Sequence, residues 1–240
     1  VDNFMDSIRA IKDEEEIGLI KKSAEIADLA FMHLKSLIKP GVREYDLAAE
    51  FDYFVRKKGA TVSFEPIILY GEVSSLPHGI PGAREIKPGG ILLIDYGARY
   101  NGYCSDATRT LFLGKPPKEY TKIYNIVLRA QEEAEAIIKP GVSVSEIDRV
   151  ARDVITREGF GDKFIHTTGH GVGLEIHEYP RISEGNNVLV EKGMVLTVEP
   201  GIYIKGFGGI RIEDLVLVND SGIEVLTRIS KEFEFRGGNI

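Results

Sequence analysis

SLIKPGVREYDLAAEFDYFVRKKGA (residues 36–60) recurs as AIIKPGVSVSEIDRVARDVITREGF (residues 136–160), at an offset of 100 residues and without a gap. The two copies share IKPGV, and they share a late glycine at Gly59 and Gly159. Chance could repeat a short string, but the helical patterns on both sides also match. We therefore interpret the pair as an internal duplication.

Helical periodicity surrounds both copies. A long amphipathic pattern precedes each one, over residues 14–37 and 119–138, and Lys-Pro-Gly ends it. A second helix is expected up to the shared glycine, and strand patterns follow in each half. We predict an α+β fold of two pseudo-symmetric αα-β halves, roughly residues 13–113 and 118–227, with antiparallel sheets covered by helices on one face.

The length and composition are those of an ordinary globular protein. The chain has 240 residues, is 43% hydrophobic and 28% charged, and carries a formal net charge of −7. Because no linker rich in Pro, Gly or Ser divides it, we expect one domain over residues 1–240. The acidic balance argues against nucleic acid. No apolar run approaches the roughly 20 residues that cross a bilayer, and no signal-peptide pattern is present, so we expect a cytoplasmic protein.

Cys104 is the only cysteine, so no internal disulfide can form. It lies between Asp95 and Asp106, which would suit a metal ligand. A lone thiol is more often a small buried hydrophobe, and we favour that interpretation.

The first acidic pair can be placed by the register of a hairpin. The Asn-Gly pair at residues 101–102 is a strong signal for a two-residue turn, because both central positions need positive φ. Such a turn sets Asp95 opposite Thr108 and Asp106 opposite Gly97. The two aspartates then share a face as diagonal neighbours, with Gly97 leaving room beside them for one cation. A surface hairpin with two unrelated aspartates is the alternative.

A second acidic pair lies in the other half. Glu199 ends the strand pattern VLTVE, and Glu213 lies in IRIEDLVLV on the same face as Arg211 and two leucines. A glutamate on such a face is costly to bury as an ion unless it is paired or binds a metal. A salt bridge from Glu213 to Arg211 is the alternative.

His170 is enclosed by glycines in GHGVG, which lets the backbone bring its ring close to a crowded centre. His78 in LPHGIPG, His166 in HTTGH and His177 in LEIHEYP lie in comparable settings. His33, in AFMHLKSL, is expected to be an ordinary half-buried helix residue.

Four carboxylates and one imidazole at one point would repel one another unless cations lay between them. Hard oxygen ligands with one nitrogen are typical of a two-metal hydrolytic site. The interface of two duplicated halves is also a sensible place for a cleft. The predicted ligands are Asp95, Asp106, His170, Glu199 and Glu213.

These motifs resemble those of the pita-bread metallopeptidases, in order and over almost the whole chain. Within that group the chain is most similar to the Xaa-Pro peptidases, prolidase and aminopeptidase P. Their LPHG segment matches the residues around His78, and Arg211 stands two residues before Glu213. Methionine aminopeptidases usually lack that arginine and tend to have Asn-Glu before Cys-His-Gly or His-Gly. His177, seven residues after His170, is shared by both groups.

The resemblance implies hydrolysis of the Xaa-Pro bond at the N-terminus of dipeptides or short peptides with proline at the second position. A water or hydroxide bridging two divalent cations is the implied nucleophile, with manganese expected first and cobalt or zinc as alternatives. Glu199 is the implied proton shuttle, and His78 and His177 are implied donors to the substrate carbonyl or the tetrahedral intermediate. His166 and Arg211 are implied to bind substrate or to orient a ligand. A homodimer is also expected.

Other interpretations stay open. Methionine aminopeptidase is the alternative activity, and a non-catalytic pita-bread module that binds peptides or proteins is the alternative class. Such modules typically lose the ligands, and creatinase-like chemistry dispenses with the metals. Aromatic residues around GIYIKGF are candidates for a proline pocket, or equally for the core. Full-length Xaa-Pro peptidases generally carry an N-terminal domain, so we expect either a natural short form or a catalytic fragment.

Overall fold

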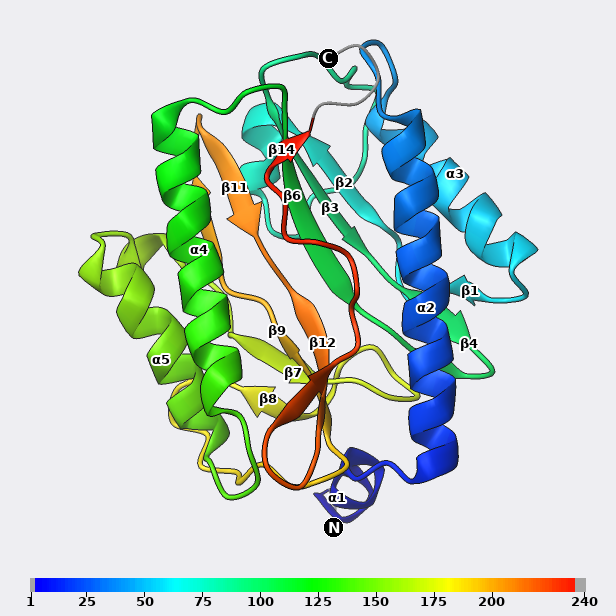
Figure 1. Cartoon of the computed structure of the whole chain (residues 1–240), viewed down its shortest axis with the longest axis vertical. Coiled ribbons are helices and arrows are strands. Elements are labelled where there is room, and N and C mark those ends of the chain that lie inside the picture. The colour runs from blue at the N-terminus through cyan, green and yellow to red at the C-terminus, as the bar shows by residue number, and fades with distance from the viewer. Residues whose placement is uncertain (1–2, 236–240) are drawn as a thin grey trace.

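Helices cover a central set of strands in this chain. A computed structural model describes residues 3–235, so the ends of the expected 1–240 domain lie outside the described residues. The helices are α1 (Asn3–Ala10), α2 (Glu14–Leu37), α3 (Glu44–Lys57), α4 (Lys118–Ile137) and α5 (Val144–Arg157), with short 3₁₀ turns η1 (Gly71–Ser75) and η2 (Gly161–Lys163). Figure 1 shows α2 and α3 beside one half of the strands, and α4 and α5 beside the other. Within the described residues, no helix is long and apolar enough to cross a bilayer.

The repeated segments form the same local structure. The bounds of α3 and α5 correspond residue for residue at the offset of the repeat, and the predicted helices are confirmed. Each follows a turn whose glycine has positive φ, 89° at Gly41 and 91° at Gly141. The amide of Gly41 donates to the carbonyl of Ile86, and that of Gly141 to Val190, each at 2.9 Å. This correspondence supports the internal duplication that we propose.

The strands within residues 3–235 form two sheets and two short ribbons. The first sheet has the order β14-β6-β3-β2, from β2 (Ile67–Tyr70), β3 (Ile91–Tyr96), β6 (Ala107–Leu113) and β14 (Glu234–Phe235). The second has the order β13-β12-β9-β7-β8, from β7 (Gly169–Gly171), β8 (Glu178–Ile182), β9 (Val195–Val198), β12 (Asp214–Val218) and β13 (Ile223–Val225). The ribbons are β1-β4-β5, from β1 (Thr61–Val62), β4 (Ala98–Tyr100) and β5 (Tyr103–Cys104), and β10-β11, from β10 (Gly201–Ile204) and β11 (Gly208–Arg211). The α+β class is confirmed; the parallel pair β14–β6 was not predicted.

The pattern IRIEDLVLV forms two strands instead of the single strand predicted. β11 ends at Arg211 and β12 begins at Asp214, and the two belong to different sheets. The amide of Glu213 donates instead to the carbonyl of Thr108 in β6, at 3.1 Å. The chain therefore changes sheets at Glu213 and ties the two halves together there.

Each half has its own hydrophobic core. One cluster joins α2 and α3 to β2, β3 and β6, and another joins α4 and α5 to β9 and β12. A third, smaller cluster contains Cys104 with Ile20 and Leu215. Cys104 is therefore a buried hydrophobe, as favoured from the sequence. His33 lies half-buried on α2, stacked on Phe54.

A buried polar network holds the C-terminal segment across the sheets, where Figure 1 shows it running between α2 and α4. Arg109, 1% exposed, donates through Nη2 to Asp214 Oδ1 at 2.6 Å and to the carbonyl of Ile229 at 2.7 Å. Lys231 Nζ lies 2.7 Å from Asp214 Oδ2 and donates to Gln131 Oε1 at 2.7 Å. Because these contacts reach both β12 and α4, the segment fastens the helices to the sheets.

Glu135, on α4, makes the stability of this network depend on pH. Burial raises its pKa to about 7, with repulsion from Asp214 adding to the shift and Lys231 opposing it. A carboxyl whose pKa rises on folding contributes stability that is present below its unfolded pKa and is lost as the pH rises through about 7. We expect Glu135→Gln to leave Tm unchanged near pH 5 and to raise it by roughly 2–4 °C near pH 8, about 1 kcal/mol, in thermal unfolding.

The exposed neighbour Glu133 supplies the matched control, since its side chain is 50% exposed. Glu133→Gln should leave the pH dependence of Tm as in the wild type. If Glu135→Gln does the same, the buried carboxyl does not carry the effect.

Candidate metal centre

The hairpin predicted around the first acidic pair is present. Asn101 and Gly102 both have positive φ, 47° and 93°, as the two-residue turn requires. Asp95 lies opposite Thr108, so the predicted register is confirmed. β3 therefore brings Asp95 to the same sheet face that Asp106 reaches at the start of β6.

Gly97 has a different role from the one predicted. A Cβ at this position would lie 2.0 Å from the carbonyl oxygen of Ser105 and 2.2 Å from Ser63 Oγ. The space beside Gly97 is therefore filled by neighbouring chain and does not provide room for a cation. Glycine is needed because the facing strand approaches too closely for any side chain.

His170 enters the site from β7. A Cβ at Gly169 would lie 2.0 Å from the carbonyl oxygen of Thr197, so the flanking glycine lets β7 pack tightly on β9. His170 Nδ1 lies 3.0 Å from the carbonyl oxygen of Gly171, which can only accept, so Nδ1 carries a proton. Nε2 then faces Glu199 at 3.3 Å and Asp106 at 3.5 Å. Burial lowers the pKa of His170, but the hydrogen bond and charge of Glu199 outweigh burial and raise it, so the metal-free ring pairs with Glu199 as a cation. A bound metal ion would take the place of the Nε2 proton and leave a neutral ring.

Arg211 links the carboxylates of the two halves. Its Nη2 donates to Asp95 Oδ2 at 2.6 Å and its Nε to Thr108 Oγ1 at 3.0 Å. Thr108 Oγ1 in turn donates to Glu213 Oε2 at 2.6 Å. The partner of Arg211 is thus Asp95, and the Arg211–Glu213 salt bridge considered as an alternative is not the contact formed.

His166 belongs to a chain of hydrogen bonds behind Arg211. Arg211 Nη1 donates to Tyr203 Oη at 2.7 Å, and Tyr203 Oη lies 2.8 Å from His166 Nε2. His166 Nδ1 lies 2.8 Å from the carbonyl oxygen of Thr167, so both ring nitrogens are engaged. Burial lowers the pKa of His166, which is consistent with a neutral ring that accepts from Tyr203. Tyr203, a candidate for a proline pocket in the sequence, instead fills this supporting position.

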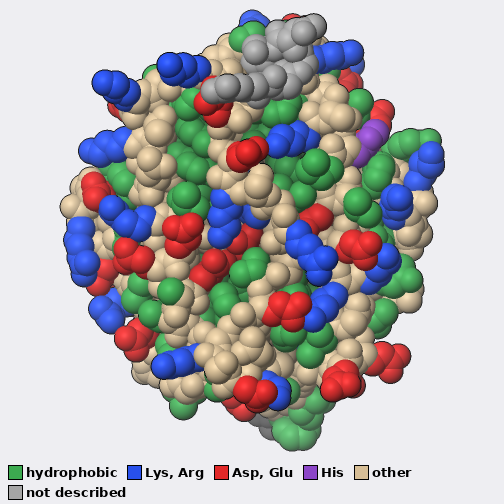
Figure 2. Space-filling view, viewed as in Figure 1, with side chains coloured by type: hydrophobic (Ala, Val, Ile, Leu, Met, Phe, Trp, Pro, Cys, Tyr) green, Lys and Arg blue, Asp and Glu red, His purple; other side chains and the backbone are tan. Residues whose placement is uncertain are grey.

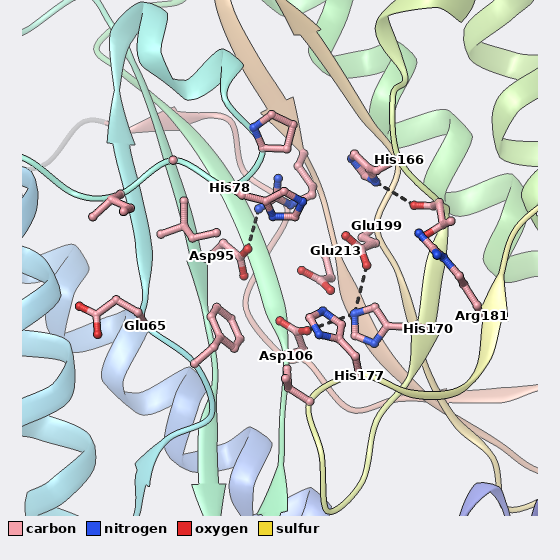
Figure 3. Close-up of a pocket in the computed structure, with 18 of the residues that line it drawn as sticks. Glu65, His78, Asp95, Asp106, His166, His170, His177, Arg181, Glu199 and Glu213 are labelled. Carbon is pink, nitrogen blue, oxygen red and sulfur yellow. Dashed lines mark hydrogen bonds and ion pairs between the residues drawn. The ribbon is translucent and has the colours of Figure 1, made fainter. Parts of the chain in front are cut away.

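All the predicted site residues line one cavity of about 730 Å³. Figure 3 labels each of them except Arg211 and shows them converging from strands and loops of both halves. They are His78, Asp95, Asp106, His166, His170, His177, Glu199, Arg211 and Glu213. Glu65, Glu178 and Arg181 also line the cavity and were not predicted. No motif in the sequence marks Arg181. It lies in β8 directly opposite His170, and that pairing is known only from the structure.

Burial and mutual repulsion dominate the electrostatics of the site. Burial raises the pKa of Asp106 and of Glu213 well above the ordinary values, and the neighbouring carboxylates raise them further. Burial also raises the pKa of Asp95, although Arg211 opposes the shift. Burial works against ionisation of Glu199 too, but its contact with His170 outweighs burial and lowers its pKa to about 2. Two of the four acids therefore have cationic partners and two do not.

The donor set fits divalent cations. One ligand atom each from Asp106, His170 and Glu213 lies within 4.8 Å of the others. Among the described residues, the buried Oδ1 atoms of Asp95 and Asp106 lack any hydrogen-bond partner. Orphaned acceptors beside repelling carboxylates are costly unless a cation satisfies them. Asp95 and Glu199 adjoin this group of three, held by Arg211 and His170 respectively.

Comparison with known proteins places this geometry in a family. The model of metallopeptidase family M24 matches residues 18–220. The Xaa-Pro dipeptidase of Pyrococcus furiosus is 46% identical over 97% of this chain and 67% of its own length. The structure of an Xaa-Pro dipeptidase from Bacillus anthracis matches with a TM-score of 0.94 and 46% identity, over 97% of this chain and 66% of that one.

A structure of an X-Pro aminopeptidase from Thermotoga maritima is similar to the same degree. Its TM-score is 0.94 at 42% identity, over 98% of this chain and 67% of that one. The chain therefore spans about two thirds of the length of these relatives. The matches confirm the resemblance and the pita-bread fold expected from the sequence.

The raised pKa values predict how cation binding changes stability. Asp106 and Glu213 contribute stability that is present below their unfolded pKa values of 3.8 and 4.5, and that is lost as the pH rises through the higher folded values. A cation that binds the ionised carboxylates offsets this loss. We expect Mn²⁺ at a hundred times Kd to stabilise chelator-treated protein by about 2.7 kcal/mol, measured as a rise in Tm that is larger at pH 8 than at pH 5.5.

Two variants make this measurement specific. Glu213→Gln should abolish the Mn²⁺-dependent rise in Tm, whereas Asp153→Asn, at a half-exposed carboxylate on α5, should leave it intact. An equal rise in Glu213→Gln and wild type would mean that Mn²⁺ binds elsewhere.

Proposed function

The chain belongs to metallopeptidase family M24, and on that premise we propose that it hydrolyses the Xaa-Pro bond at the N-terminus of dipeptides or short peptides. The observation that carries the proposal is the cavity in which Asp106, His170 and Glu213 cluster beside the Arg211–Asp95 pair. Relatives that share nearly half of its residues are named Xaa-Pro dipeptidases, which supports the same substrate class.

Divalent cations held by the proposed ligands would supply an activated water and polarise the scissile carbonyl. Glu199 is the proposed proton shuttle because its carboxylate lies at the cavity, oriented by His170 and by Thr197 Oγ1 at 3.2 Å. As the water oxygen attacks the carbonyl carbon, Glu199 accepts its proton. It then delivers the proton to the proline nitrogen while the C–N bond breaks.

His78 and His177 are the proposed donors to the substrate carbonyl. They reach the cavity from different halves, His78 from the turn after η1 and His177 from the loop before β8. The His177 ring packs edge-on against His170, with centroids 4.4 Å apart. Burial lowers the pKa of His177, and the charge of His170 lowers it further, so a neutral ring with one N–H is the form near pH 7. Such a donor stabilises negative charge that develops on the carbonyl oxygen.

The proposed site can accept proline after the scissile bond because it does not depend on an amide hydrogen there. An Xaa-Pro bond is a tertiary amide without N–H, so a site that grips the amide hydrogen cannot use it. The cavity wall near β2 instead offers apolar surface from Phe64, Ile67 and Ile80. These side chains replace the aromatic residues around GIYIKGF as our candidates for contact with the proline ring.

Arg181 favours a dipeptide among the possible substrates. Its exposed side chain lines the cavity, and a guanidinium there can bind the C-terminal carboxylate of a dipeptide by paired hydrogen bonds. In a longer peptide that carboxylate lies farther from the scissile bond. We therefore propose dipeptidase activity over aminopeptidase activity.

The resemblance to Xaa-Pro peptidases also supports proposals for the metal, the oligomeric state and the cellular location. Manganese is the first candidate cation, with cobalt or zinc as alternatives, because carboxylates with one imidazole accept each of them. A homodimer and a cytoplasmic location are proposed with it.

A substrate panel tests the proposed reaction directly. Chelator-treated protein reloaded with Mn²⁺, Co²⁺ or Zn²⁺ should release the first residue from Ala-Pro, do so more slowly from Arg-Pro-Pro, and leave Met-Ala-Ser intact, as followed by chromatography. Glu213→Ala should lower kcat by more than about 10²-fold, because loss of a ligand costs more than loss of a residue that supports one. Glu224→Ala, at a half-exposed pair with Lys21, should not lower kcat. Cleavage of Met-Ala-Ser alone would establish a methionine aminopeptidase. Cleavage of none, without metal uptake, would establish a binding module.

The role proposed for Arg181 predicts a change in substrate-length preference. Arg181→Met should raise KM for Ala-Pro about tenfold, the cost of roughly one charge-assisted hydrogen bond, with a smaller change for Arg-Pro-Pro. The comparison of kcat/KM for the two peptides in each variant measures this. A parallel loss for both peptides would remove Arg181 from carboxylate recognition. The matched control is Arg149→Met, at an exposed arginine on α5.

A further inference from the structure

The N-terminal segment (residues 3–12) contacts the loop that carries His177 (residues 173–177). α1 packs against β8, and Figure 1 shows it just below the sheet that contains β8. The loop at residues 173–177 contains no helix or strand of its own and leads directly into Glu178, the first residue of β8. Something other than a strand ladder must therefore fix the position of His177.

Glu178 is the point where the segment and the loop meet. Its side chain is 4% exposed, and two cations of the N-terminal segment pair with it: Arg9 Nη2 in direct contact with Oε1, and Lys12 Nζ at 3.3 Å from Oε2. Lys12 is itself buried, with a side chain 2% exposed, and its Nζ also donates to the carbonyl of Ala10. A buried carboxylate with two cationic partners occupies one conformation, because each contact has a required direction.

The loop folds around this carboxylate. The amide of Glu175 donates to Glu178 Oε1 at 3.0 Å, and a Cβ at Gly173 would lie 2.5 Å from Glu178 Oε2. The carbonyl of Gly173 accepts from the amide of Cys104 at 2.8 Å, which fastens the start of the loop to β5. The loop is thus closed at both ends, with His177 adjacent to the charged group that closes it.

Glu178 also lines the same cavity as the metal-binding carboxylates. Without its cations it would add another negative charge to a site that already holds four, and it could turn toward any divalent ion there. Arg9 and Lys12 neutralise Glu178 and direct it toward α1, away from that cluster.

We propose that Arg9 and Lys12, acting through Glu178, are positioning residues that hold His177 against His170. The N-terminal segment is then part of the catalytic apparatus, although it contributes no group that touches substrate. The kinetic readout of this proposal rests on the proposed peptidase reaction. The structural readout does not.

The structural test measures amide hydrogen exchange by mass spectrometry on metal-free protein. Arg9→Met and Lys12→Met should each speed exchange across residues 172–178 by about tenfold or more, because the Glu175 amide loses its fixed acceptor. Arg9→Lys, which keeps the charge, should restore most of the protection. Arg149→Met, at an arginine whose side chain is 60% exposed, should leave exchange unchanged. Unchanged exchange in both Arg9→Met and Lys12→Met would overturn the proposal.

The kinetic test is a double-mutant cycle on Ala-Pro hydrolysis. Arg9→Met should lower kcat about tenfold with KM within about twofold, and it should have less than about a twofold effect in a His177→Ala background. An undiminished loss in that background would overturn the proposal, since Arg9 would then act without His177. Glu178→Gln gives a second route if Arg9→Met does not fold, because the amide oxygen can still accept from Glu175 while the attraction to both cations falls.

The two tests separate failure of this inference from failure of the proposed function. Faster exchange in the variants supports the positioning role even if no Xaa-Pro peptide is cleaved. Unchanged exchange contradicts it even if the wild type is an active peptidase.

Discussion

Mutual repulsion among four buried carboxylates is the constraint on which the rest of this structure depends. Asp95, Asp106, Glu199 and Glu213 border one cavity, and burial together with repulsion raises the pKa of two of them well above ordinary values. A flexible framework would relieve this repulsion by moving the acids apart. The acids are instead carried on or next to strands that the two halves hold against each other, and Glu213 sits where the chain passes from one sheet to the other.

Strand alternation explains how the framework resists that repulsion. Thr108 and Glu213 turn toward the cavity, while the next residues, Arg109 and Asp214, turn toward the helices and form a buried ion pair at 2.6 Å. Arg109 Nη1 also donates to the carbonyl of Glu213 at 2.6 Å, so the backbone of this acid is held from behind. The polar network under the helices and the acidic cluster in the cavity therefore lie on opposite faces of the same strands.

The sequence predicted those parts of the structure that local rules govern. The repeated helices and the register of the Asp95–Asp106 hairpin depend on residues close together in the chain, and both are confirmed. The site residues could be found because each lies in a short motif. The role of Gly97 and the Arg9–Glu178 pair could not be found, because they depend on which distant segments pack together; Arg9 and Glu178 are 169 residues apart. The distribution of surface charge also depends on how distant segments pack. Figure 2 shows acidic and basic side chains interspersed over the face that carries the helices.

Charge balance favours two cations over one at the proposed centre. Arg211 is a permanent cation bound to Asp95, and His170 is neutral when its Nε2 lone pair serves as a ligand. Four carboxylates and one guanidinium then leave three negative charges in the cavity. A single divalent cation would leave one negative charge, which would repel an anionic nucleophile. Two would leave one positive charge, which an anionic nucleophile cancels, so the same acids that destabilise the metal-free cavity make it suited to hold that nucleophile.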